Sequence, residues 1–76
     1  MIIKYFGRIA ESIGKTQEAW TKTGIDVFSF KKELLIRYPQ LRIETIQIAI
    51  NLELATDSIE INDNDEVAVL PQFAGG

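Results

Sequence analysis

The chain contains no cysteine and no histidine, and this double absence limits what can stabilise a fold of 76 residues. Disulfides and Cys/His zinc sites, which hold many small domains together, are both excluded. A domain of this size must then rely on a regularly patterned apolar core. Because 46% of its residues are hydrophobic and 25% are charged, the composition is that of an ordinary folded protein. We therefore expect one small soluble domain without a bound metal.

Catalytic side chains are also scarce. Without cysteine there is no thiolate nucleophile, and without histidine the common proton shuttle near neutral pH is missing. Ser12, Ser29 and Ser58 have no histidine to activate them. The acidic run around 57–66 is typical of a solvated loop edge. The sequence therefore predicts no autonomous enzyme, no metal site and no cofactor bound by this chain.

The charge and hydropathy patterns exclude two classes of partner. The chain has 8 Lys and Arg against 11 Asp and Glu, a formal net charge of −3. Nucleic acids and anionic membranes both require clustered positive charge, so neither is an expected partner. No apolar run approaches the roughly 20 residues of a membrane span, and no signal peptide is evident. A cytoplasmic location is expected.

Apolar periodicity predicts the order of the secondary-structure elements. The strongest strand is 44–50, where Ile46, Ile48 and Ile50 alternate with smaller or polar residues. The main helix is predicted over 27–38, with Asp26 as its N-cap and Pro39 as its stop. The remaining predicted elements are a short helix over 8–13, strands over 1–6, 16–22 and 66–70, and short extended pieces over 52–55 and 59–61.

This order predicts an α+β fold with a mixed sheet and one main helix on one face. If the first and last strands lie side by side and parallel in the middle, the arrangement is the ubiquitin-like β-grasp, although periodicity alone does not fix that topology. The domain is expected over 1–71, followed by a flexible tail over 72–76. The predicted core contains Ile3, Tyr5, Val27, Phe30, Leu34, Ile46, Ile48, Ile50, Val67 and Val69.

Two apolar residues do not fit on the helix-covered face of the predicted sheet. If Lys4 and Glu66 face solvent, then Phe6 and Leu70 share their face, because side chains alternate along a strand. Large apolar side chains exposed near the C-terminal tail suggest a surface for a partner. A role as part of the core remains the alternative for one of them, and Trp20, in an otherwise polar strand, is not placed.

The sequence finishes with Gly75 and Gly76. By chance, a Gly-Gly ending is expected in about one chain in 200, since glycine is ~7% of residues. A glycine carboxylate has no neighbouring Cβ and can enter a narrow channel. In a chain without cysteine, this carboxylate is the one group that could carry an activated acyl group or sulfur.

Four segments together resemble the small, sulfur-carrying subunit of molybdopterin synthase, in the ubiquitin-like β-grasp superfamily. They are Tyr5-Phe-Gly-Arg-Ile-Ala-Glu11 with Gly14, Arg37-Tyr-Pro-Gln-Leu41, Ala49-Ile-Asn51, and Asp63-Asn-Asp-Glu-Val-Ala-Val-Leu-Pro71 with Ala74-Gly75-Gly76. The match spans nearly the whole chain, and its last segment is the most specific. Asn64 replaces the usual turn glycine, and Gln72 replaces a second proline.

The resemblance implies a reaction cycle and two partners. An adenylyltransferase related to ubiquitin-activating enzymes uses ATP to adenylate Gly76, and sulfur then replaces the adenylate as a thiocarboxylate. The large synthase subunit, in a heterotetramer with this subunit, passes the sulfur to cyclic pyranopterin monophosphate. By position, Gly75 and Gly76 form the reacting tail, so the chain is a sulfur-donating subunit. Phe6, Leu54, Leu70, Phe73 and Ala74 are implied to contact the partner.

Three alternatives keep the same fold. The chain could carry sulfur for thiamin thiazole synthesis, although such carriers are usually shorter and lack a segment like 5–11. It could be a ubiquitin-like protein modifier, since conjugation and sulfur carriage diverge only after adenylation. It could also be a plain β-grasp binding module whose tail is inert. Removing Gly76 distinguishes these alternatives: a plain module would keep its function, whereas every carrier would lose it.

Overall fold

The computed structural model describes residues 1–22 and 24–72, apart from the side chain of Ile43. The elements follow the predicted order, with some shorter than expected. They are β1 (Ile2–Tyr5), α1 (Gly7–Ile13), β2 (Gln17–Ala19), β3 (Ile25–Asp26), α2 (Val27–Arg37), the 3₁₀ turn η1 (Ile43–Thr45), β4 (Ile46–Ile50), β5 (Glu53–Leu54), β6 (Glu60–Ile61) and β7 (Glu66–Pro71).

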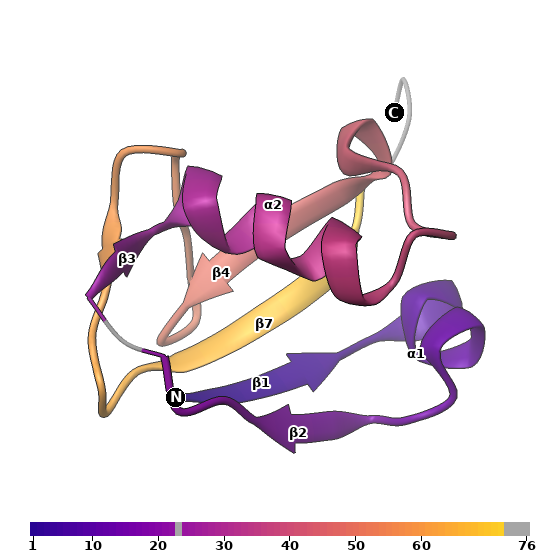
Figure 1. The fold of residues 1–76 in the computed structure, drawn as a ribbon, viewed down its shortest axis with the longest axis horizontal. Coiled ribbons are helices and arrows are strands. Elements are labelled where there is room, and N and C mark those ends of the chain that lie inside the picture. Colours follow the sequence, from indigo (N-terminus) through magenta and orange to yellow (C-terminus); the bar gives the residue numbers. More distant parts are fainter. Residues whose placement is uncertain (23, 73–76) are drawn as a thin grey trace.

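The main sheet has the order β2-β1-β7-β4-β5, and β1 and β7 run parallel in its middle (Figure 1). Ile3 lies opposite Val67 and Tyr5 opposite Val69. The neighbouring pairs, β1 with β2 and β7 with β4, are antiparallel. The first and last strands are thus adjacent, which confirms the β-grasp arrangement that the order of elements allowed.

Helix α2 crosses one face of this sheet (Figure 1). Its first turn is capped as predicted, because Asp26 Oδ1 accepts a hydrogen bond from the Ser29 amide at 2.7 Å. Val27, Phe30 and Leu34 are buried on its inner side. The helix ends at Arg37, and the amide of Tyr38 closes it by donating to the Leu34 carbonyl. The sequence therefore located this helix to within one residue.

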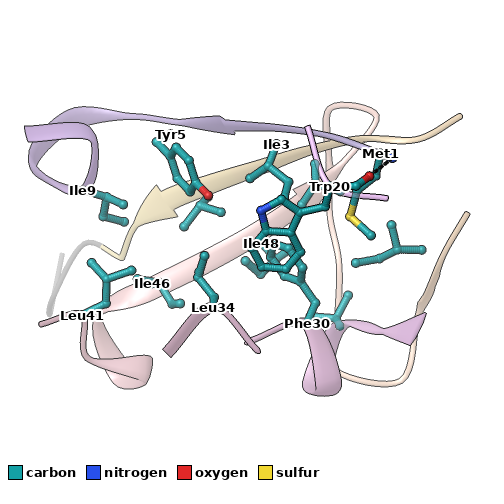
Figure 2. Packing of buried hydrophobic residues seen from close by; sticks show 14 residues of the cluster. Met1, Ile3, Tyr5, Ile9, Trp20, Phe30, Leu34, Leu41, Ile46 and Ile48 are labelled. Carbon is teal, nitrogen blue, oxygen red and sulfur yellow. Dashed lines mark hydrogen bonds between the residues drawn. The ribbon is translucent and has the colours of Figure 1, made fainter. Parts of the chain in front are cut away.

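The core lies between the sheet and α2, as Figure 2 shows for Ile3, Tyr5, Leu34 and Ile48. Of the predicted core residues, Ile50 alone is only partly buried, because it is the last residue of β4. Trp20, which the sequence did not place, is buried at 3% exposure. Its ring lies 5.1 Å from that of Phe30, and the Arg37 guanidinium lies 4.0 Å above it. The indole thus completes the core at its edge.

The structure differs from the sequence-based prediction at four points. Strand β3 pairs with β6 in a separate two-stranded sheet, and η1 precedes β4; neither β3 nor η1 was predicted. The last strand includes Pro71, which lies opposite Ile46. Gln72 was predicted to begin the unpaired tail. Its backbone N–H instead donates a hydrogen bond to the Thr45 carbonyl oxygen at 2.7 Å. The hydrogen-bonded part of the chain therefore extends at least to residue 72.

Candidate functional site

The sheet has one face that α2 does not cover, and it is built by simple alternation. Because Ile3, Tyr5, Val67 and Val69 point into the core, the residues between them point the other way. Lys4 Nζ lies 2.6 Å from Glu66 Oε1, and both side chains are about 40% exposed at 41% and 39%. This ion pair confirms that the face of Lys4 and Glu66 is open to solvent.

Three apolar residues predicted as partner contacts lie on this open face. Phe6, just after β1, is 43% exposed, and its amide donates to the Val69 carbonyl at 3.2 Å, which sets it beside Leu70. Leu70 is half-buried in β7. Leu54 is 67% exposed on β5, opposite Ala49 of β4. The register thus places Phe6, Leu54 and Leu70 on one face, and we call these three residues the open-face patch.

Two small residues connect the parts of the open-face patch. Ala49 lies opposite both Leu54 and Ala68, so Leu54, Ala49 and Ala68 form one row across three strands. Ala49 is only 5% exposed, so neighbouring side chains largely cover the middle of this row. Ala49 and Ala68 belong to segments that carry the resemblance, but no role in partner contact was predicted for them. The signal in the sequence was a small residue, in each of two strands, at a position that alternation places opposite the core.

The end of the described chain is held between two other segments. On one side, Gln72 is bonded to Thr45, at the end of η1. On the other side, a Cβ added at Gly7 would lie 3.2 Å from Cγ of Pro71, so α1 begins in close contact with the end of β7. The described part of the chain therefore ends at a defined place beside Phe6 and Leu70.

A groove of about 420 Å³ adjoins the end of the described chain. Thr45 belongs both to the groove and to the hydrogen bond with Gln72. Gln40 Nε2 closes one side by donating to the Ser12 carbonyl at 3.1 Å. Arg42 at its rim pairs with Glu44 at 3.1 Å. The groove is lined by Arg8, Ile9, Ser12, Gln40, Leu41, Arg42 and Thr45.

The strongest electrostatic cluster lies away from the open-face patch, at the edge of the core. Glu18 of β2 accepts hydrogen bonds from the hydroxyls of Tyr5 and Tyr38, and Lys15 Nζ lies 3.6 Å from its other oxygen. Burial alone would raise the pKa of Glu18, but the bonds from Tyr38 and Tyr5 and the charge of Lys15 lower it below its ordinary value. Burial and the same carboxylate raise the pKa of Tyr5 far above its usual range. The cluster links β1 and β2 to the end of α2.

The remaining predicted site residues, Phe73, Ala74, Gly75 and Gly76, lie outside the described residues. Within 1–22 and 24–72, no group of three acidic side chains is arranged to hold a metal ion. In the same part of the chain, neither helix has the length and apolarity needed to cross a bilayer.

Comparison with known proteins gives a consistent result. The model of the ThiS family matches residues 3–76. The "Molybdopterin synthase sulfur carrier subunit" of Mycobacterium tuberculosis is 37% identical over an alignment that covers 97% of this chain and 94% of that protein.

Solved structures share the fold at lower identity. A putative molybdopterin converting factor, subunit 1, from Pyrococcus furiosus superposes with a TM-score of 0.79 at 22% identity, covering 95% of each chain. The small archaeal modifier protein 1 of H. volcanii superposes with a TM-score of 0.74 at 20% identity, again over 95% of each chain. These two likenesses show a common fold and no more.

Proposed function

This chain belongs to the ThiS family, and from that premise we propose that it is the sulfur carrier of a molybdopterin synthase. The observation that carries the proposal is the 37% identity to a curated sulfur carrier subunit over 97% of the chain. The matched region of the family model includes Gly75 and Gly76. In this role the chain donates sulfur and depends on a second subunit for catalysis.

The proposed chemistry takes place at the carboxylate of Gly76. One of its oxygens attacks the α-phosphorus of ATP on an adenylyltransferase, releasing pyrophosphate and forming an acyl adenylate. A sulfur nucleophile then displaces AMP, which leaves a thiocarboxylate. In the large synthase subunit, the thiocarboxylate sulfur forms a bond to a carbon of cyclic pyranopterin monophosphate. Water then cleaves the resulting thioester, which leaves the sulfur on the pterin and restores the carboxylate of Gly76, and two deliveries supply the two sulfurs of the dithiolene. ATP serves the activating enzyme, so we propose no cofactor for this chain.

The described fold supports such a tail in two ways. The last strand is central in the sheet, with Ile46 opposite Pro71 and Thr45 bonded to Gln72, so the base of the tail is fixed. Four residues beyond Gln72 can reach as far as about 14 Å at ~3.5 Å each. Phe6 and Leu70 of the open-face patch lie at the same end of the sheet, and the patch offers apolar surface to the large subunit. We extend the proposal to a cytoplasmic heterotetramer of two large and two small subunits.

Deleting Gly76 tests the proposal. The shortened chain should fold normally and still bind the large subunit through the open-face patch. It should make no molybdopterin, because its carboxylate stops one residue short of the reacting centre and effective molarity falls steeply with misplacement. The measurement is product formation with activating enzyme, ATP, a sulfur source and the pyranopterin precursor. Product at near wild-type yield would contradict the proposal.

The intact mass of the unaltered chain separates the alternatives. After incubation with activating enzyme, ATP and a sulfur source, the mass should rise by the difference between one sulfur and one oxygen. A chain that gains this mass but transfers sulfur only to a thiazole precursor would be a carrier for thiamin synthesis. A chain found joined through Gly76 to lysines of other proteins would be a modifier. No ATP-dependent change would indicate a plain binding module.

A further inference from the structure

Helix α2 exposes two large apolar side chains on the side that faces away from the core. Phe28 is 47% exposed and Ile36 is 75% exposed, although both belong to the element that covers the sheet. With Lys32 between them, these residues are spaced four apart, so they line one side of the helix. Lys32 Nζ lies 5.3 Å from the centre of the Phe28 ring. We call Phe28, Lys32 and Ile36 the helix stripe.

A pocket of about 250 Å³ adjoins this stripe. Ile36 and Lys32 form one side of it, and the half-buried Ile25 provides further apolar surface. Lys22 and Glu33, which also line the pocket, face each other at 3.5 Å. The stripe thus has an adjoining hollow in which a side chain of another molecule could be buried.

The charge near α2 differs from that of the rest of the molecule. Four of the eight Lys and Arg residues lie on α2 or bond to it, whereas only three of the eleven carboxylates do. Asp26 caps the helix, Glu33 pairs with Lys22, and Asp57 pairs with Lys31 at 2.9 Å. Lys32 has no carboxylate partner among the described residues. The α2 side is therefore slightly basic on an acidic protein.

The area of the outer face of α2 decides whether a second copy of the chain or a short segment of another protein could bind there. A helix of eleven residues is about 16 Å long and ~10 Å wide, so its outer half offers roughly 250 Å². A stable dimer buries about 800 Å² on each partner. A second copy of the chain bound through α2 alone would therefore be unstable, whereas one short amphipathic segment fits the area.

We propose that the helix stripe and its pocket bind a short amphipathic segment of another protein, one that has acidic residues beside apolar ones. Its apolar side chains cover Phe28 and Ile36, and its carboxylates face Lys22 and Lys32. Because α2 covers one face of the sheet and the open-face patch lies on the other, the segment leaves that patch free (Figure 1). The carrier could then be held by one protein while its tail is used by another.

The test uses the full chain labelled with ¹⁵N and two synthetic helical peptides of about 14 residues. Both peptides have the same leucines at helical spacing, one with glutamates and the other with lysines at the flanking positions. The acidic peptide should shift α2 amides in a saturable manner, with a Kd on the order of 100 μM. The basic peptide should bind at least about tenfold more weakly.

Three variants sharpen the result. Ile36→Ser and Phe28→Ser should each weaken the acidic peptide several-fold, while Leu52→Ser, at an apolar residue 91% exposed on the β4–β5 turn, should not. The double variant Lys22→Glu with Lys32→Glu should prefer the basic peptide. Equal binding of both peptides, shifts confined to the open face, or unchanged binding by the stripe variants would each overturn the proposal. Self-association of the free chain through α2 would overturn the choice of occupant.

Discussion

Gly7 is a residue whose conformation and surroundings both disfavour a side chain. Its φ is +57°, in the left-handed region, and an added Cβ would lie 3.2 Å from Cγ of Pro71. Gly14 has a φ of +87°, but nothing lies within 4 Å of its Cβ position. A substitution at Gly14 thus tests backbone strain alone, whereas a substitution at Gly7 tests strain together with contact against Pro71.

We predict that Gly7→Ala lowers the free energy of unfolding by about 2 kcal/mol, and Gly14→Ala by ~1 kcal/mol, because left-handed backbone costs a non-glycine residue 1–2 kcal/mol. The excess at Gly7 comes from contact with Pro71. Urea denaturation of both variants measures the difference. Equal losses would mean that Pro71 moves away freely, and that the start of α1 does not fix the end of β7.

Glu18 is a second residue whose contribution to the free energy of unfolding can be measured. Its pKa is below the ordinary value of 4.5, so its contribution to stability is fully present above that pH and is lost as the pH falls through the folded-state pKa. Glu18→Gln removes the charge that the two tyrosine hydroxyls and Lys15 stabilise.

At pH 7 this variant should be less stable by about 1 kcal/mol, the difference between charged and neutral hydrogen bonds. Below pH 4.5 the deficit should shrink as the wild-type carboxylate becomes protonated. Thermal melts across this range measure it, with Glu11→Gln on the exposed side of α1 as the control. A deficit independent of pH would indicate a packing effect without a role for the charge.

Among the elements, the β4–β5 hairpin is closed by an unfavourable turn. Its two central residues, Asn51 and Leu52, have φ values of 51° and 74°. Asparagine tolerates this backbone, and glycine is preferred at the second position of such turns. Leu52 is 91% exposed, so it gains almost no burial in return.

We predict that Leu52→Gly stabilises the protein by about 1 kcal/mol, because the left-handed strain of leucine disappears and little contact is lost. The expected gain is reduced by the greater freedom of glycine in the unfolded chain. Leu54→Gly, in β5 next to the turn, should instead destabilise. Chemical denaturation of both variants provides the comparison, and a loss of stability in Leu52→Gly would show that Leu52 makes contacts that its exposure does not reveal.

The elements also show what periodicity can and cannot predict. Strand β4 was evident because three isoleucines alternate over five residues, and α2 because cap, apolar spacing and proline agree. Strand β3 has only two residues, too few for any period to register. Trp20 lies beyond a three-residue edge strand, and its burial depends on Phe30 and Arg37 from α2. Such long-range packing cannot be read from its neighbours in sequence.

For the whole molecule, the decisive feature is the parallel pairing of β1 with β7. It brings Phe6 near Leu70 across more than sixty positions of sequence, and this proximity follows from the topology. Alternation predicted which face each residue occupies, and the ion pair of Lys4 with Glu66 confirms that assignment. The sequence could not predict that Thr45 would hold Gln72, because that bond depends on a 3₁₀ turn without apolar periodicity.

The open-face patch can be tested with a pair of variants matched within one segment. Phe6 and Ile2 are both 43% exposed, and both lie on the open face, at opposite ends of the β1 segment. Either residue replaced by Asp should leave the domain folded, because each residue is 43% exposed and lies outside the buried core. Of the two, only Phe6 lies beside Leu70 and the end of the described chain. An aspartate there would be buried without a partner once the proposed large subunit docks, and loss of a central interface residue costs about 2 kcal/mol or more.

We therefore predict that Phe6→Asp raises the Kd for the large subunit at least about thirtyfold, whereas Ile2→Asp changes it less than about threefold. Calorimetric titration of each variant against the large subunit measures both values, and circular dichroism shows that both remain folded. If the two variants weaken binding equally, the partner covers the whole open face. If neither does, the large subunit holds this chain by its tail alone, and the exposure of Phe6 has another cause.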